Sequence, residues 1–124
     1  MDGPAELVSG VALNLVVLRS ANLRLAAAFY AALGLTIGWE RHGAGPEHMT
    51  AQAGGVLLEI YPLGERASTA GVRLGFVVPN LALAVAAVRV VGGAVVSLPQ
   101  PGPWGLRAVV EDADGHRIEL LQGA

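Results

Sequence analysis

The hydrophobic positions along the chain form the same pattern twice. Runs rich in leucine and β-branched residues at 11–18 and 72–78 each predict a strand. Apolar residues at helical spacing follow each run, which predicts a helix that begins after Asn22 in the first copy and after Asn80 in the second. Three shorter strand candidates follow each helix. They span residues 36–41, 48–53 and 56–61 in the first copy and 94–98, 106–111 and 116–121 in the second.

The two copies also share residues in register. Asn-Leu-x-Leu-Ala begins at Asn22 and again at Asn80, and a glycine ends each helix. Turns rich in glycine and proline separate the strands, and residues 99–105 are predicted as one of them. We therefore predict an α+β fold in which two tandem βαβββ modules form a curved, cup-like sheet with the helices outside. Module one spans about residues 11–61, a linker about 62–71 and module two about 72–122, within a single domain of residues 1–124.

Composition excludes several classes of partner. Eight Lys and Arg residues against ten Asp and Glu leave no basic surface for a phosphate backbone, so nucleic acid is not expected as a partner. The apolar stretch at 76–98 contains Pro79, Asn80, Arg89 and Gly92, which fit a strand end and a capped helix, so no membrane association is expected. The absence of cysteine and of a secretory signal pattern favours a cytoplasmic location.

Several stretches resemble the motifs of one known superfamily. They are residues 22–34, 56–60, 76–81, 104–105 and 112–120. Together they resemble the vicinal oxygen chelate superfamily, which includes glyoxalase I, bleomycin-resistance proteins and extradiol dioxygenases. The resemblance covers nearly the whole chain. It implies a concave, mostly apolar cup for a small molecule, of the kind in which small ligands bind.

The resemblance also assigns four inward positions that hold a divalent metal in the enzymes of this superfamily. In this chain they are Leu15, Glu59, Arg73 and Glu119. Leucine has no lone pair and a guanidinium repels a divalent ion, so no metal or other cofactor is expected on this set. Arg73 is expected to replace the metal by pairing with one or both carboxylates across the cup floor. The alternatives are partly solvated carboxylates, or one unpaired carboxylate that acts as a general base.

Strand parity and the resemblance indicate further ligand-binding residues. Leu57 and Tyr61 share strand parity with Glu59 and are predicted to point into the cup. Trp39 and Trp104 are expected to close its rim, where their rings would stack on a planar ligand.

The three histidines are predicted in loops. His42 and His48 lie in or beside the loop between the second and third strands, which lies at the cup rim in relatives, and His116 lies in the last hairpin turn. Loop histidines are usually solvated, and a ligand contact is the alternative for His42 and His48. None has the local spacing of a metal motif with either carboxylate. Ser68 and Thr69 have no His–Asp set near them in the sequence, so nucleophilic catalysis is not predicted.

The leading hypothesis is a metal-free protein that binds and sequesters a largely apolar or aromatic, antibiotic-like small molecule, as self-resistance proteins do. It includes no catalytic residue. The alternative is a lyase, isomerase or dioxygenase of the same fold, either metal-free or with metal ligands from elsewhere, such as His42 or His48. Because relatives build cups between subunits, sometimes with exchanged halves, we expect a homodimer with two ligand sites.

Overall fold

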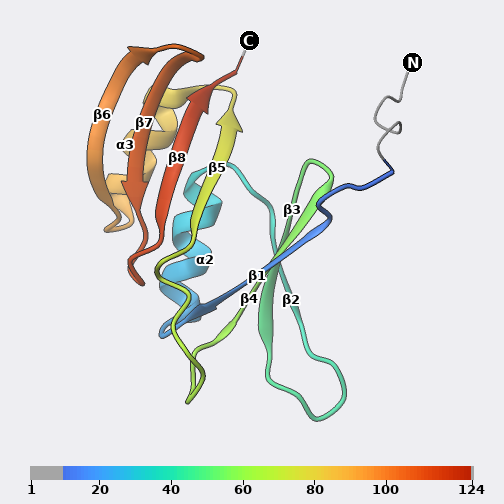
Figure 1. The fold of residues 1–124 in the computed structure, drawn as a ribbon. Coiled ribbons are helices and arrows are strands. Elements are labelled where there is room, and N and C mark those ends of the chain that lie inside the picture. Colours follow the sequence, from blue (N-terminus) through green and yellow to red (C-terminus); the bar gives the residue numbers. More distant parts are fainter. Residues whose placement is uncertain (1–9, 124) are drawn as a thin grey trace.

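The computed structural model describes residues 10–123, which form two four-stranded sheets and two helices (Figure 1). In the first unit, α2 (Leu23–Ala32) accompanies β1 (Leu15–Ser20), β2 (Ile37–Glu40), β3 (His48–Ala53) and β4 (Val56–Pro62). In the second, α3 (Leu81–Val90) accompanies β5 (Arg73–Val78), β6 (Ala94–Gly102), β7 (Gly105–Glu111) and β8 (Arg117–Gln122). The strand orders are β1-β4-β3-β2 and β5-β8-β7-β6, and in both sheets the first and last strands of the unit are parallel neighbours. This confirms the predicted α+β fold of two βαβββ units.

Both helices begin where the sequence predicts. The Asn22 side chain accepts hydrogen bonds from two backbone N–H groups of α2, each at 3.1 Å, and Asn80 accepts one at 3.1 Å in α3. Gly34 and Gly92, just beyond the helices, have φ angles of 109° and 86°, which residues with a Cβ rarely adopt. No helix within residues 10–123 has the length and apolar character needed to cross a membrane.

Two predicted boundaries are wrong. The first strand begins at Leu15 rather than at residue 11. The stretch from Pro99 to Gly102, predicted as part of a turn, belongs to β6, which pairs with β7 through two register shifts. Because β6 is the last strand in the order of its sheet, its outer edge needs no ladder hydrogen bond, and proline is tolerated on such an edge.

One hydrophobic core joins the two units. It includes the buried residues Leu18, Phe29, Met49, Leu58 and Ile60 of the first unit and Leu81, Val88, Val110, Ile118 and Leu120 of the second. α2 lies next to α3 and between the two sheets (Figure 1). A Cβ at Gly93 would lie 3.0 Å from the Phe29 ring and 2.5 Å from Val88 Cγ1, so the turn after α3 needs glycine at this position. The helix-facing side of each sheet is thus buried in a common core.

A buried hydrogen-bond network around Asp112 also ties the units together. Tyr30, in α2, donates its hydroxyl proton to Asp112 Oδ2 at 2.8 Å, and His116 Nδ1 lies 2.8 Å from the same oxygen. Because a carboxylate only accepts, Nδ1 carries a proton, and in the neutral ring Nε2 accepts from the Thr69 hydroxyl at 2.7 Å. Thr69 Oγ1 in turn accepts the backbone N–H of Arg19 in β1 at 3.0 Å. The network therefore links β1, α2, the segment before β5 and the turn before β8.

The network shifts two pKa values. Burial, together with the charge of Asp112, raises the pKa of the Tyr30 hydroxyl far above its usual value. For Asp112, burial alone would raise the pKa, but hydrogen bonds from His116 and Tyr30 outweigh it and hold the pKa of this carboxyl below its usual value. A carboxyl with a lower pKa in the folded state stabilises the fold above the unfolded-state pKa. This contribution is lost as the pH falls through the folded-state pKa.

We predict that Asp112→Asn lowers the free energy of unfolding at neutral pH by about 2–4 kcal/mol, because it removes a buried, ionised acceptor of several hydrogen bonds. The variant should also lose less stability than the parent below about pH 4. Urea denaturation across this pH range measures both effects, with Glu65→Gln as the control at an exposed carboxylate. Parallel pH profiles for Asp112→Asn and the parent would contradict the prediction.

Candidate functional site

Each sheet has one face that points away from the helices. In the first sheet this open face carries Leu15, Val17, Glu40, His48, Leu57, Glu59 and Tyr61. In the second it carries Arg73, Gly75, Val77, Arg107, Glu119 and Leu121. The structure thus places Leu15, Leu57, Glu59 and Tyr61 on one surface and Arg73 and Glu119 on another.

The two carboxylates of interest have different partners. Arg73 Nη2 lies 3.1 Å from Glu119 Oε2, and Arg107 Nη2 lies 3.2 Å from Glu119 Oε1. The Glu59 carboxylate instead lies 3.7 Å from His48 Nε2. Arg73 therefore pairs with Glu119, one of its two expected partners. Because these side chains are about half exposed, the ion pairs add little to stability, and their charged groups are accessible to a ligand.

The two tryptophans lie in different places. Trp104 is 81% exposed in the turn between β6 and β7, and it lines a hollow together with Val77 and Glu119. Trp39 pairs in register with buried Met49, so it lies on the opposite face of its sheet from Glu59. The expectation that both tryptophans close the rim of one cup is therefore wrong for Trp39. The parity of β2 is set by its register with β3, which the sequence does not reveal.

Two of the three histidines are buried rather than solvated. His48 is the first residue of β3 and is 1% exposed, and its ring stacks on Tyr61 with 4.0 Å between centroids. His116 is also 1% exposed and belongs to the Asp112 network. His42 is exposed in the loop after β2, as expected, but its Nε2 lies 3.4 Å from Glu40 Oε1. Glu40 was not predicted as a site residue. Glu40 lies beside His48 because the two residues pair across β2 and β3.

The structure places a His–Asp pair beside Thr69, contrary to the sequence interpretation. The order Thr69 Oγ1, His116 Nε2, His116 Nδ1 and Asp112 is the order of a hydrolase triad. However, the Thr69 hydroxyl already accepts a backbone N–H group, His116 is buried, and the three residues line neither of the cavities described below. The arrangement is therefore structural.

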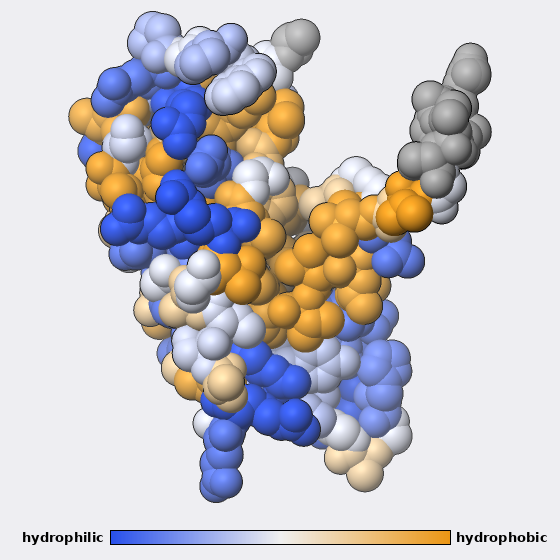
Figure 2. All heavy atoms as spheres, viewed as in Figure 1, coloured by the Kyte–Doolittle hydropathy of each residue, from blue (hydrophilic) through white to orange (hydrophobic). Residues whose placement is uncertain are grey.

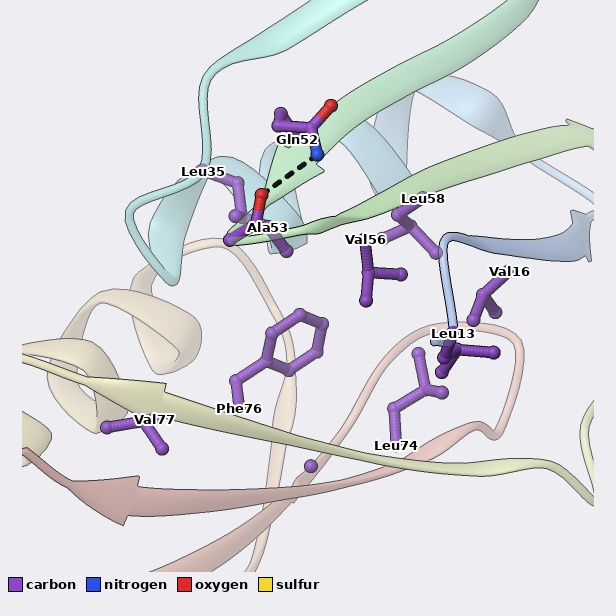
Figure 3. Close-up of a pocket in the computed structure, with 12 residues that line it drawn as sticks. Leu13, Val16, Leu35, Gln52, Ala53, Val56, Leu58, Leu74, Phe76 and Val77 are labelled. Atoms are coloured by element: carbon purple, nitrogen blue, oxygen red, sulfur yellow. Dashed lines mark hydrogen bonds between the residues drawn. The ribbon is translucent and has the colours of Figure 1, made fainter. Parts of the chain in front are cut away.

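An apolar cavity of about 400 Å³ lies at the seam between the two units (Figure 3). Val16 and Leu58 from the first sheet face Leu74 and Phe76 from β5 across it, and Leu13 lies at one end. The same region forms a continuous hydrophobic surface where the two halves of the molecule meet (Figure 2). The volume is within the range of small-molecule sites.

A second hollow of about 230 Å³ lies on the open face of the second sheet. Trp104, Arg107, Glu119 and Leu121 contribute to its lining. Three β5 residues, Gly75, Phe76 and Val77, line both hollows, so the two hollows border the same strand. A Cβ at Gly75 would have no neighbour nearer than the Glu119 carbonyl at 3.9 Å, which leaves the space above the strand open. The seam cavity is apolar, and the second hollow has the charged side chains of Arg107 and Glu119 at its polar end.

The sequence matches the model of the glyoxalase-like domain family over residues 15–121. The chain belongs to this family. The match confirms the resemblance to the vicinal oxygen chelate superfamily. No protein of curated function matches the chain.

Solved structures share the fold of this glyoxalase-like domain. A hypothetical protein from S. aureus, SA1046, has a TM-score of 0.75 and 22% identity, with 90% of this chain and 93% of the other covered. An antibiotic-binding protein from Streptomyces sp. CB03234, TnmS3, has a TM-score of 0.73 and 20% identity, with 92% and 97% covered. A glyoxalase/bleomycin resistance protein from the same strain has a TM-score of 0.70 and 21% identity, with 90% and 100% covered.

The four positions that the superfamily uses for metal are divided between the two sheets of the glyoxalase-like domain. Leu15 and Glu59 lie on the open face of the first sheet, and Arg73 and Glu119 on that of the second. Leu15 offers no ligand atom, and the Arg73 guanidinium lies directly against Glu119. The residues at these positions therefore do not fit a divalent metal.

Proposed function

We propose that this glyoxalase-like domain binds and sequesters a small, largely apolar or aromatic molecule, without a metal ion bound by the superfamily's set of four positions. The observation that carries the proposal is the pair of hollows that border β5 and share the lining residues Gly75, Phe76 and Val77. An apolar body would fill the seam cavity, and a polar group would contact Arg107 or Glu119 at the other end. An apolar site with a few polar groups that orient the ligand is typical of small-molecule binding.

Two features favour binding over catalysis at this site. Both carboxylate oxygens of Glu119 already have partners, because Oε2 lies 3.1 Å from Arg73 Nη2 and Oε1 lies 3.2 Å from Arg107 Nη2. Trp104 is widely exposed at the edge of the polar end, where its ring can stack on a planar ligand. An antibiotic-like ligand agrees with these features and with the fold shared with TnmS3, an antibiotic-binding protein. The cytoplasmic location expected from the sequence stays a prediction.

We predict that Gly75→Val and Trp104→Ala each weaken binding of the naphthalene dye ANS at least tenfold, about 1.4 kcal/mol or more. Valine would fill the open space beside Gly75, at a strand position where β-branched residues are favoured, and alanine would remove the stacking surface. Fluorescence titration measures the dissociation constants.

Trp39→Ala is the matched control, because it removes the same side chain from the other face of the first sheet. The proposal requires that this variant bind the dye as the parent does. Unchanged binding in both Gly75→Val and Trp104→Ala would show that the hollows across β5 are not the binding site.

We further propose that the protein is a homodimer with two ligand sites. Leu15 and Val17 are 44% and 40% exposed on the open face of the first sheet, and Val77 is 69% exposed on that of the second. A second copy would bury these apolar side chains and complete a cup over each open face.

Light scattering should give twice the chain mass of 12.7 kDa at concentrations of about tens of micromolar. Val17→Arg should shift the protein towards the monomer, because it places a charged side chain in the proposed contact. Leu25→Arg, at an exposed position on α2, is the control. A monomeric parent, or equal effects of the two variants, would contradict the dimer.

A further inference from the structure

Four side chains with metal-ligating atoms meet on the open face of the first sheet, away from the hollows across β5. Glu40 ends β2, His42 lies in the following loop, His48 begins β3 and Glu59 lies in β4. One ligand atom from each lies within 4.8 Å of the others. Only Glu59 is a superfamily metal position, so the set differs from the one that the resemblance assigns.

The buried ring of His48 points an unpartnered nitrogen into this group. Its Nδ1 lies 3.3 Å from the Pro46 carbonyl, which can only accept, so Nδ1 donates to that carbonyl and Nε2 is the ring nitrogen left for another partner. Nε2 is buried and has no hydrogen-bond partner in the part of the chain that the structure describes. It faces Glu59 Oε2 at 3.7 Å and Glu40 Oε1 at 3.8 Å. A buried ring nitrogen that faces two carboxylates without a hydrogen bond to either is an arrangement that a bound cation would satisfy.

The spacing of these atoms suits a tetrahedral metal ion. Zinc binds imidazole nitrogen and carboxylate oxygen at about 2.0–2.2 Å, which puts neighbouring ligands of a tetrahedron about 3.3–3.6 Å apart. The Nε2 atoms of His42 and His48 lie 3.4 and 3.8 Å from Glu40 Oε1, close to this range. Two imidazoles and two carboxylates form a nitrogen and oxygen donor set that zinc accepts.

We propose that Glu40, His42, His48 and Glu59 form a binding site for a divalent transition metal ion, with Zn²⁺ as the best-fitting ion. His48 and Glu59 form the inner wall, and the stacked Tyr61 ring fixes the orientation of His48. Glu40 and His42 are exposed, so the ion can enter from solvent and be closed in by the loop that carries His42. The site does not depend on the proposed small-molecule function.

A second group of potential metal ligands differs from this one in its hydrogen bonds. Asp112, Asp114 and His116 also lie close together, but their polar atoms already have partners. Asp114 Oδ1 accepts the N–H of Ala21 at 2.8 Å, and the His116 ring contacts Asp112 and Thr69. That group is satisfied by hydrogen bonds alone, whereas His48 Nε2 is not.

The test is isothermal titration of the chelator-treated protein with Zn²⁺. We expect one ion per chain with a dissociation constant of about 1 µM or tighter. His48→Gln and His42→Gln should each weaken binding at least tenfold, and Glu47→Gln, at an exposed position in the same loop, should bind as the parent does. His42 is exposed, so its replacement tests the site even if His48→Gln fails to fold. Co²⁺ bound in place of Zn²⁺ should give the intense visible absorption of tetrahedral cobalt.

Two results would overturn the proposal. One is a parent protein that binds Zn²⁺ no tighter than about 100 µM, which is the behaviour of isolated surface groups. The other is a His42→Gln variant with the parent's affinity and cobalt spectrum, which would mean that the ion binds elsewhere. Neither result bears on dye binding across β5, so this proposal and the small-molecule proposal fail independently.

Discussion

The buried carboxylate of Asp112 is the interaction that fixes the relative position of the two units. It accepts hydrogen bonds from Tyr30 of the first unit and from His116 of the second, and His116 continues to Thr69 and the backbone of β1. Sliding of the units would break the Tyr30–Asp112 and Arg19–Thr69 hydrogen bonds and leave these buried and part-buried polar groups without partners. The hydrophobic core buries the apolar surfaces of both units, and the hydrogen bonds around Asp112 require one orientation between the units.

The fixed position of the units creates the apolar seam. Val16 and Leu58 lie on one side of the cavity and Phe76 on the other, and neither unit alone has both walls. β5 is the first strand in the order of its sheet and borders the seam, so its residues face both the cavity and the open face. Gly75 leaves the space above this strand open. The function we propose thus depends on how two similar units meet, rather than on either unit alone.

Local features of the fold could be predicted from the sequence, because they depend on neighbouring residues. Asn22 and Asn80 cap helices that begin at the next residue. Gly34 and Gly92 lie two residues beyond the helix ends. The motif residues 112–120 contributed to the family resemblance, which the family match confirms. Within one strand, alternation was enough to place Glu59 and Tyr61 on the same face.

Features that depend on distant partners could not be predicted. His116 looks like a solvated turn residue until Tyr30 and Thr69, remote in sequence, are placed against the same network. Trp39 faces the helix side because β2 pairs with β3 in one register, and a shift by one residue would reverse it. The group around His48 forms only when three strands and a loop come together, so no local motif marks it.

We propose one ligand site that spans β5, from the seam cavity to Trp104. Backbone amide NMR spectra recorded during titration with ANS would locate the ligand, because each amide reports on its own surroundings. We expect chemical-shift changes at Gly75 and Val77, at Leu58 in the seam and at Leu121 on the open face, all with one dissociation constant. Changes confined to the surface around Trp39, with the β5 amides unmoved, would contradict it.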